Sequence, residues 1–198
     1  MVSQQAGLLV VDVQNDFCPG GALAVPDGSR VVPVLNRYIE RFADAGLPVY
    51  ASRDWHPPQS RHFSAFGGSW PVHCVQSTAG AAFHPELRLP REAVILTKGT
   101  DPHEDAYSVF QAQTDNGTLF RDRLAKDRVA HLYVGGLATD YCVRASVLDA
   151  LSAGLAATLL IDAIAGVELN PGDSERAIAE MTAAGAATAT LSDIAPGI

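Results

Sequence analysis

The chain has 198 residues, 47% of them hydrophobic, which is enough to close one sizeable core but too little for two. Its formal net charge of -8 leaves no Lys/Arg cluster to displace phosphate counterions, so nucleic acid is excluded as an expected partner. Neither a signal peptide at residues 1–7 nor an uninterrupted membrane-spanning stretch is present, which predicts a soluble, cytoplasmic protein that binds no membrane.

Short apolar runs alternate with helix-like segments along the chain. The runs lie at residues 7–13, 47–52, 93–97, 129–134, 155–161 and 187–191, and their β-branched and aliphatic composition predicts strands buried on both faces. Helical patterns occupy residues 31–45, 119–126 and 139–153, and Asp173 is expected to cap a further helix that runs to Ala184. This alternation predicts an α/β fold, a three-layer αβα Rossmann-like domain over residues 1–198 with a six-stranded, mainly parallel sheet.

The segment from residue 53 to residue 92 departs from this alternation. It holds Pro57-Pro58, Gly67-Gly68 and three further prolines, which predicts an ordered loop with little regular structure. Loops of this length inside a compact domain are usually functional, so we expect a site here.

Reactive side chains follow the predicted strands. Asp12 lies near the end of the first strand, Lys98 follows the third, and Cys142 follows the fourth, where a helix is expected to begin. Ligands of open parallel sheets bind beyond the carboxyl ends of the strands, so these residues should converge. A helix N-terminus favours a thiolate. An acid, a cation and a thiol together supply a proton acceptor, charge stabilisation and a nucleophile, which indicates a cysteine hydrolase.

Each of these three residues also has an ordinary structural explanation. A cysteine is often a small buried apolar residue, an acid at the end of a strand often caps a loop, and a lysine is often a surface charge. The three cysteines, Cys18, Cys74 and Cys142, form no C-x-x-C pair and suit free thiols in a reducing compartment. The position of Cys142 at a strand-to-helix switch favours the catalytic interpretation.

A second cluster lies in the long loop. Its members, in the patterns D-W-H-x5-H and W-P-V-H, are Asp54, His56, His62 and His73. One carboxylate and three imidazoles suit one divalent metal ion, for which we expect zinc, with iron and manganese as alternatives. Residues 53–92 are therefore predicted to be a metal-binding loop insertion. The competing interpretation is a set of surface histidines that cluster by chance.

Aromatic residues flank the reactive segments. Phe17, Trp70 and Tyr107 would suit the walls of a small pocket for a flat ring. Ordinary core packing explains each of them, taken singly, about as well.

Eight segments carry a resemblance to a known family, and the resemblance extends from the first predicted strand to the last. They are V-D-V-Q-N-D-F-C-P-G-G-A-L (Val11–Leu23), S-R-D-W-H (Ser52–His56), H-F-S (His62–Ser64), W-P-V-H-C-V (Trp70–Val75), F-H-P-E-L (Phe83–Leu87), K-G-T-D-P (Lys98–Pro102), D-A-Y-S-V-F (Asp105–Phe110) and G-G-L-A-T-D-Y-C-V (Gly135–Val143). These segments resemble those of the bacterial nicotinamidases, also called pyrazinamidases, which belong to the isochorismatase-like cysteine hydrolases. The metal-loop segments discriminate best, because relatives acting on isochorismate or carbamoyl compounds generally lack this Asp/His set. Ser77 and Ala79 stand where the family usually has Gly and Pro. This difference bears on the stiffness of the loop that contains them and leaves the expected chemistry unchanged.

The resemblance implies a role for each matching residue. Cys142 would be the nucleophile, Asp12 the proton shuttle and Lys98 the positioning and charge-stabilising residue, with the Asp/His set as metal ligands and the aromatic residues around the substrate ring. A cis Leu137–Ala138 peptide would present the Ala138 N–H, together with that of Cys142, as an oxyanion hole. The implied reaction is hydrolysis of nicotinamide, and also of pyrazinamide, through a cysteine thioester in NAD salvage.

Two other functions stay open at this level. One is a metal-dependent amidohydrolase of another small amide in which water, rather than Cys142, attacks. The other is a catalytically silent module that binds a small aromatic ligand, which the presence of every expected reactive residue disfavours. The oligomeric state also stays open, a homo-oligomer included.

Overall fold

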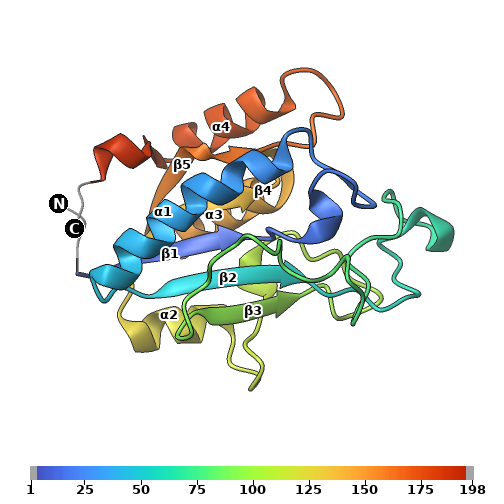
Figure 1. Cartoon of the computed structure of the whole chain (residues 1–198), viewed down its shortest axis with the longest axis horizontal. Helices are drawn as coiled ribbons and strands as arrows, with labels where there is room; N and C mark the ends of the chain where they lie inside the picture. Colours follow the sequence, from blue (N-terminus) through green and yellow to red (C-terminus); the bar gives the residue numbers. More distant parts are fainter. Residues whose placement is uncertain (1–3, 195–198) are drawn as a thin grey trace.

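Six strands form one parallel sheet, in the order β3-β2-β1-β4-β5-β6, in the computed structural model, which describes residues 4–194 (Figure 1). Their bounds are β1 (Ala6–Val11), β2 (Val49–Asp54), β3 (Val94–Lys98), β4 (His131–Leu137), β5 (Ala156–Ala165) and β6 (Ala187–Ala189). Each neighbouring pair is parallel. The predicted three-layer α/β fold is confirmed, and within the described residues the sheet is wholly rather than mainly parallel.

Helices cover both faces of the sheet. Their bounds are α1 (Val31–Asp44), α2 (Phe120–Asp127), α3 (Arg144–Ser152) and α4 (Asp173–Ala183). Helix α1 packs on one face, and α2, α3 and α4 contribute to the core on the other face. No helix in the described part of the chain combines the length and apolar composition needed to cross a bilayer.

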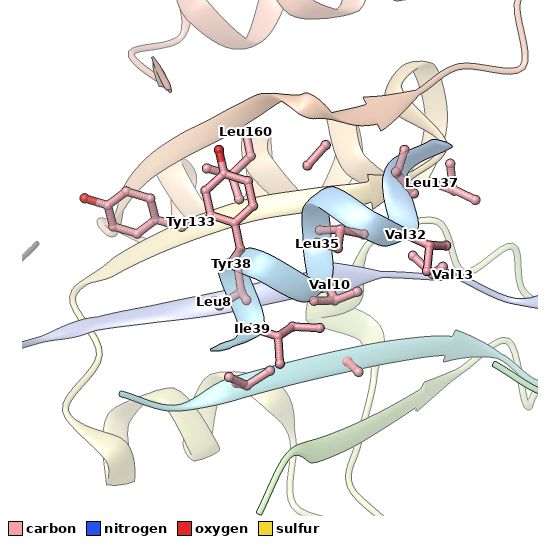
Figure 2. Packing of buried hydrophobic residues seen from close by; sticks show 14 of the residues in the cluster. Leu8, Val10, Val13, Val32, Leu35, Tyr38, Ile39, Tyr133, Leu137 and Leu160 are labelled. Carbon is pink, nitrogen blue, oxygen red and sulfur yellow. The ribbon is translucent and has the colours of Figure 1, made fainter. Parts of the chain in front are cut away.

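Helix α1 shows how the sequence pattern produces the packing. Its apolar residues recur every three or four positions, so Leu35 and Ile39 project from one side of the helix onto Leu8 and Val10 of β1 (Figure 2). All four side chains are at most 3% exposed. Truncating one such side chain to Ala typically costs about 2–5 kcal/mol, so this face anchors the first strand of the sheet.

Two helix starts differ from the prediction. Gly172, in a left-handed conformation with φ of 84°, is the N-cap of α4, and Asp173 is its first residue. The Asp173 carboxylate accepts from the backbone N–H of Asn170 instead, at 2.8 Å, so the predicted capping role is wrong. A π-helical turn, Thr139–Val143, precedes α3 where one continuous helix was expected.

Strand β4 runs further than its apolar run suggests, through Gly135 and Gly136 to Leu137. Glycine usually weakens a strand, but a Cβ at Gly136 would lie 2.1 Å from the carbonyl oxygen of Val11 on β1. Only a residue without a side chain allows the two strands to approach so closely here.

The long segment between β2 and β3 contains a single 3₁₀ turn, Ser64–Phe66, and isolated bridges in place of regular strands. It extends beyond the carboxyl ends of both strands (Figure 1). This agrees with the expected ordered loop and places it where ligands of such sheets bind.

Candidate active site

Three charged residues meet where the first three strands end. Asp12 directly follows β1, while Asp54 and Lys98 are the last residues of β2 and β3 and are paired in the sheet register. Cys142 reaches the same place from the π-helical turn after β4. All four are at most 7% exposed, and the expected convergence of Asp12, Lys98 and Cys142 is present.

The Lys98 ammonium is the centre of this cluster. Its Nζ lies 2.8 Å from Oδ2 of Asp12 and 2.5 Å from Oδ1 of Asp54, and it donates to the carbonyl oxygen of Ala106 at 2.9 Å. The Sγ of Cys142 is 3.5 Å from the same Nζ. Lys98 and Asp12 therefore form a buried ion pair.

Burial and charge set the protonation states in the cluster. Burial raises the pKa of the Asp12 carboxyl, against the attraction of Lys98. For Asp54, burial acts in the same direction, but Lys98 and His56 prevail and the pKa falls below its ordinary value. The pKa of Lys98 is raised, because its two carboxylates outweigh the effect of burial. Lys98 is therefore a permanent cation, and Asp12 is the better proton acceptor of the two acids.

Cys142 rests as a thiol. Burial raises the pKa of its thiol well above the ordinary value, and the nearby Lys98 opposes this only in part. Burial thus acts against the thiolate that was expected at the start of a helix. Ligand atoms of Cys142, Asp12 and Asp54 lie within 4.8 Å of one another, so a carboxylate is at hand to receive the thiol proton during attack.

Two buried polar residues that the sequence prediction missed hold the acids in place. The Ser52 hydroxyl donates to Oδ1 of Asp12 at 2.7 Å. The Gln14 side chain bonds both the backbone N–H of Asp54 (2.7 Å) and its carbonyl oxygen (2.8 Å). Both residues are fully buried, and a polar residue in or just after an apolar run was the signal that could have revealed them.

The three loop histidines also come together, beside Asp54. Each ring has an oxygen near its Nδ1, namely the carbonyl of Gly99 for His56 (3.1 Å), the Asp105 carboxylate for His62 (2.5 Å) and the carbonyl of Pro71 for His73 (2.7 Å). These oxygens can only accept, so they assign the proton to Nδ1 and leave the Nε2 lone pair available in each ring.

Gly99 shows why the histidine cluster requires a particular residue next to Lys98. A Cβ at this position would lie 2.6 Å from Cε1 of His56, and the backbone has a φ of 69°. Glycine is thus required on both grounds, and its carbonyl can then reach the imidazole of His56.

The residues present fit a divalent metal ion. The Nε2 of His56 is buried without a hydrogen-bond partner and lies 3.8 Å from Oδ2 of Asp54. Ligand atoms of the three histidines lie within 4.8 Å of one another. Burial lowers the pKa of His73 to about 4 and also lowers that of His62, so both rings are neutral at neutral pH, as metal binding requires.

One of the cavities formed by the described residues adjoins both clusters. The three expected aromatic residues, Phe17, Trp70 and Tyr107, line it together with Cys142 and His62. The Trp70 indole N–H donates to the Tyr107 hydroxyl at 2.9 Å, which fixes the two rings relative to each other. The cavity is therefore aromatic on its walls and polar where the two clusters meet it.

Further wall residues were not foreseen. Tyr141 contacts Trp70 edge-to-face with ring centroids 4.8 Å apart, and Leu23 and Val167 line the same cavity. The Asp140 carboxylate holds Val167 in place by accepting from its backbone N–H at 2.9 Å. These contacts join distant segments, so no local sequence pattern indicates them.

The peptide between Leu137 and Ala138 is cis, as the family resemblance implies. Ala138 and Cys142 both line the cavity, Ala138 directly before the π-helical turn that links β4 to α3 and Cys142 within it.

Comparison with known proteins agrees with this geometry. The family model described as Isochorismatase domain matches residues 6–193. The chain belongs to this family. Among curated family relatives, the nicotinamidase of Escherichia coli (strain K12) is 43% identical, covering 94% of this chain and 95% of its own length.

Solved structures extend the likeness within the family. The pyrazinamidase of Pyrococcus horikoshii in complex with zinc has a TM-score of 0.87 at 44% identity, covering 94% of this chain and 99% of its own. A protein of L. infantum in complex with nicotinate has a TM-score of 0.88 at 32% identity, covering 98% of this chain and 97% of its own. The resemblance expected from the sequence segments is thereby confirmed.

Proposed function

We propose that this isochorismatase-family protein is a nicotinamidase, which hydrolyses nicotinamide to nicotinate and ammonia in NAD salvage and also accepts pyrazinamide. The observation that carries the proposal is that Lys98 contacts both Asp12 and Cys142, and that Cys142 lines an aromatic cavity together with His62 and His73. The names of the E. coli and P. horikoshii relatives support the same activity.

In the first stage, Cys142 attacks the carboxamide carbon. The thiol proton passes to Asp12 as the S–C bond forms, and the carbonyl electrons move onto oxygen. Backbone N–H groups of Ala138 and Cys142 stabilise the oxyanion, and Lys98 balances the negative charge of the buried acids. When the oxyanion collapses, the C–N bond breaks and Asp12 returns the proton to nitrogen, so ammonia leaves.

In the second stage, water cleaves the thioester. Asp12 accepts a proton from the water as its oxygen bonds to the acyl carbon. Collapse of this second oxyanion breaks the C–S bond, and the sulfur regains a proton from Asp12. Nicotinic acid is formed and the resting thiol is restored. The acid loses its proton to solvent, where the released ammonia takes up a proton, so the products are nicotinate and ammonium and the two stages balance.

The role of the histidine cluster is to orient the substrate. Asp54, His56, His62 and His73 would hold one divalent ion, with zinc favoured, and this ion would supply a Lewis-acidic contact for the ring nitrogen of the substrate. Phe17, Trp70 and Tyr107 enclose the ring, so that its carboxamide points at Cys142.

Ammonia release from matched amides tests the proposal. The zinc-loaded protein should release ammonia from nicotinamide and pyrazinamide, and much more slowly from benzamide, which has the same carboxamide but no ring nitrogen. Equal rates with benzamide would show that the histidine cluster does not orient the substrate through its ring nitrogen. No release from any of the three would contradict the proposed function and favour a silent binding module.

A further inference from the structure

The partner of the His62 ring differs in kind from those of the other two rings. His56 and His73 have backbone carbonyls at Nδ1, whereas His62 has the carboxylate of Asp105 at 2.5 Å. A carboxylate partner fixes the ring orientation and the Nδ1–H tautomer, and it makes Nε2 a stronger electron-pair donor than a carbonyl partner does.

Asp105 reaches the site from outside it. Its side chain is 61% exposed while that of His62 is 5% exposed, and the two residues are separated by 43 positions in the chain. The contact between Asp105 and His62 satisfies no buried backbone group. A role in the packing of the core therefore explains it poorly. The backbone of Asp105 is itself tied, because its carbonyl accepts from the Gln111 side chain at 3.3 Å.

The segment 105–107 contacts each part of the pocket in turn. Asp105 contacts His62, the carbonyl of Ala106 accepts from Lys98, and the hydroxyl of Tyr107 accepts from Trp70. Three successive residues therefore bridge the histidine cluster, the charged cluster and the aromatic wall. Within this segment, it is the side chain of Asp105 that contacts a proposed metal ligand.

We infer that Asp105 is a positioning residue that orients His62 and strengthens the hold of the histidine cluster on its divalent ion. The inference rests on the proposed function only in taking this cluster as the metal site. The ion is bound less tightly without the Asp105 carboxylate, because the His62 ring can then rotate and its Nδ1 proton loses a fixed acceptor. Loss of such a partner lowers metal affinity by about 10–100-fold.

Zinc affinity, measured by competition with a chromophoric chelator, tests this without any substrate. The variants are Asp105→Ala, Asp105→Asn and, as a control for loop charge, Glu104→Ala at the adjacent exposed position. We expect about a 10–100-fold weaker zinc affinity for D105A, a smaller loss for D105N, whose amide oxygen can still accept from Nδ1, and wild-type affinity for E104A. Thermal unfolding of the zinc-free proteins checks that the variants fold alike.

Three results would overturn the inference. They are a D105A affinity within twofold of wild type, a loss in E104A equal to that in D105A, and a loss in D105N as large as in D105A. At saturating zinc, kcat of D105A should recover toward wild type, which a general structural defect would not allow. A wild-type protein that binds zinc but hydrolyses no amide would contradict the proposed function and leave this affinity comparison intact.

Discussion

Lys98 and Asp54 form a buried ion pair that joins the two halves of the pocket. Asp54 belongs to the histidine cluster through His56, and Lys98 belongs to the cluster of Asp12 and Cys142. The sheet register pairs Asp54 directly with Lys98, so the ends of β2 and β3 enforce the contact. The groups proposed to orient a substrate are thus fixed relative to those proposed to cleave it.

Replacing Lys98 should destabilise the protein as well as inactivate it. Lys98→Met leaves Asp12 and Asp54 buried together without a cation, which should lower the free energy of unfolding by about 3–5 kcal/mol. Urea denaturation measures the change. Lys126→Met, at the chain's other and exposed lysine, is the matched control and should change stability by no more than about 0.5 kcal/mol. Equal stability of the two variants would show that the cation is not needed in the folded state.

Zinc should stabilise the protein through the histidine cluster. At a free zinc concentration 100 times the dissociation constant, binding to the native state should add about 2.7 kcal/mol to the free energy of unfolding. Thermal unfolding with zinc and with excess chelator should therefore differ for wild type. The difference should be much smaller in His56→Ala and unchanged in His103→Ala, an exposed histidine. An H56A response matching that of H103A would place the ion elsewhere.

The hydrogen bond between Trp70 and Tyr107 should matter for substrate binding. Tyr107→Phe keeps the ring but removes the acceptor for the Trp70 indole N–H, which costs about 0.5–1.5 kcal/mol. We expect kcat/KM for nicotinamide to fall about 2–10-fold, mainly through KM, because the wall loosens while the reacting groups stay in place. Tyr133→Phe changes a tyrosine in the core against α1 and should leave KM unaltered. A fall in kcat alone in Y107F would argue against a purely binding role.

Much of the fold could be predicted from the sequence, because the patterns of apolar residues that indicate strands and helices are local. Apolar runs predicted all six strands, and the spacing of Leu35, Ile39 and Phe42 predicted α1, since a buried face leaves a periodic trace in the sequence. The missed end of β4 has a tertiary cause. Gly135 and Gly136 resemble the start of a loop, yet both lie within β4, and at Gly136 the close approach of Val11 on β1 excludes a side chain.

The candidate site was predictable where chemistry follows a strand. Asp12, Lys98 and Cys142 could be placed together because parallel strands end at one edge. The supporting residues could not be placed in this way. The exposed position of Asp105 gives no sign of its contact with His62, although it lies in a segment that resembles the family, and Gln14 contacts the backbone of Asp54, 40 positions away. Such partners depend on tertiary geometry, which local sequence periodicity does not encode.

Whether Cys142 attacks the amide can be decided by measuring ammonia release from nicotinamide by zinc-loaded Cys142→Ala. Cys18→Ala, at another buried free thiol, serves as the control. We expect C142A to keep its zinc and to lose activity by about a thousandfold or more, while C18A stays active. A C142A protein that hydrolyses nicotinamide at a rate comparable to wild type would contradict the account and indicate direct attack by water.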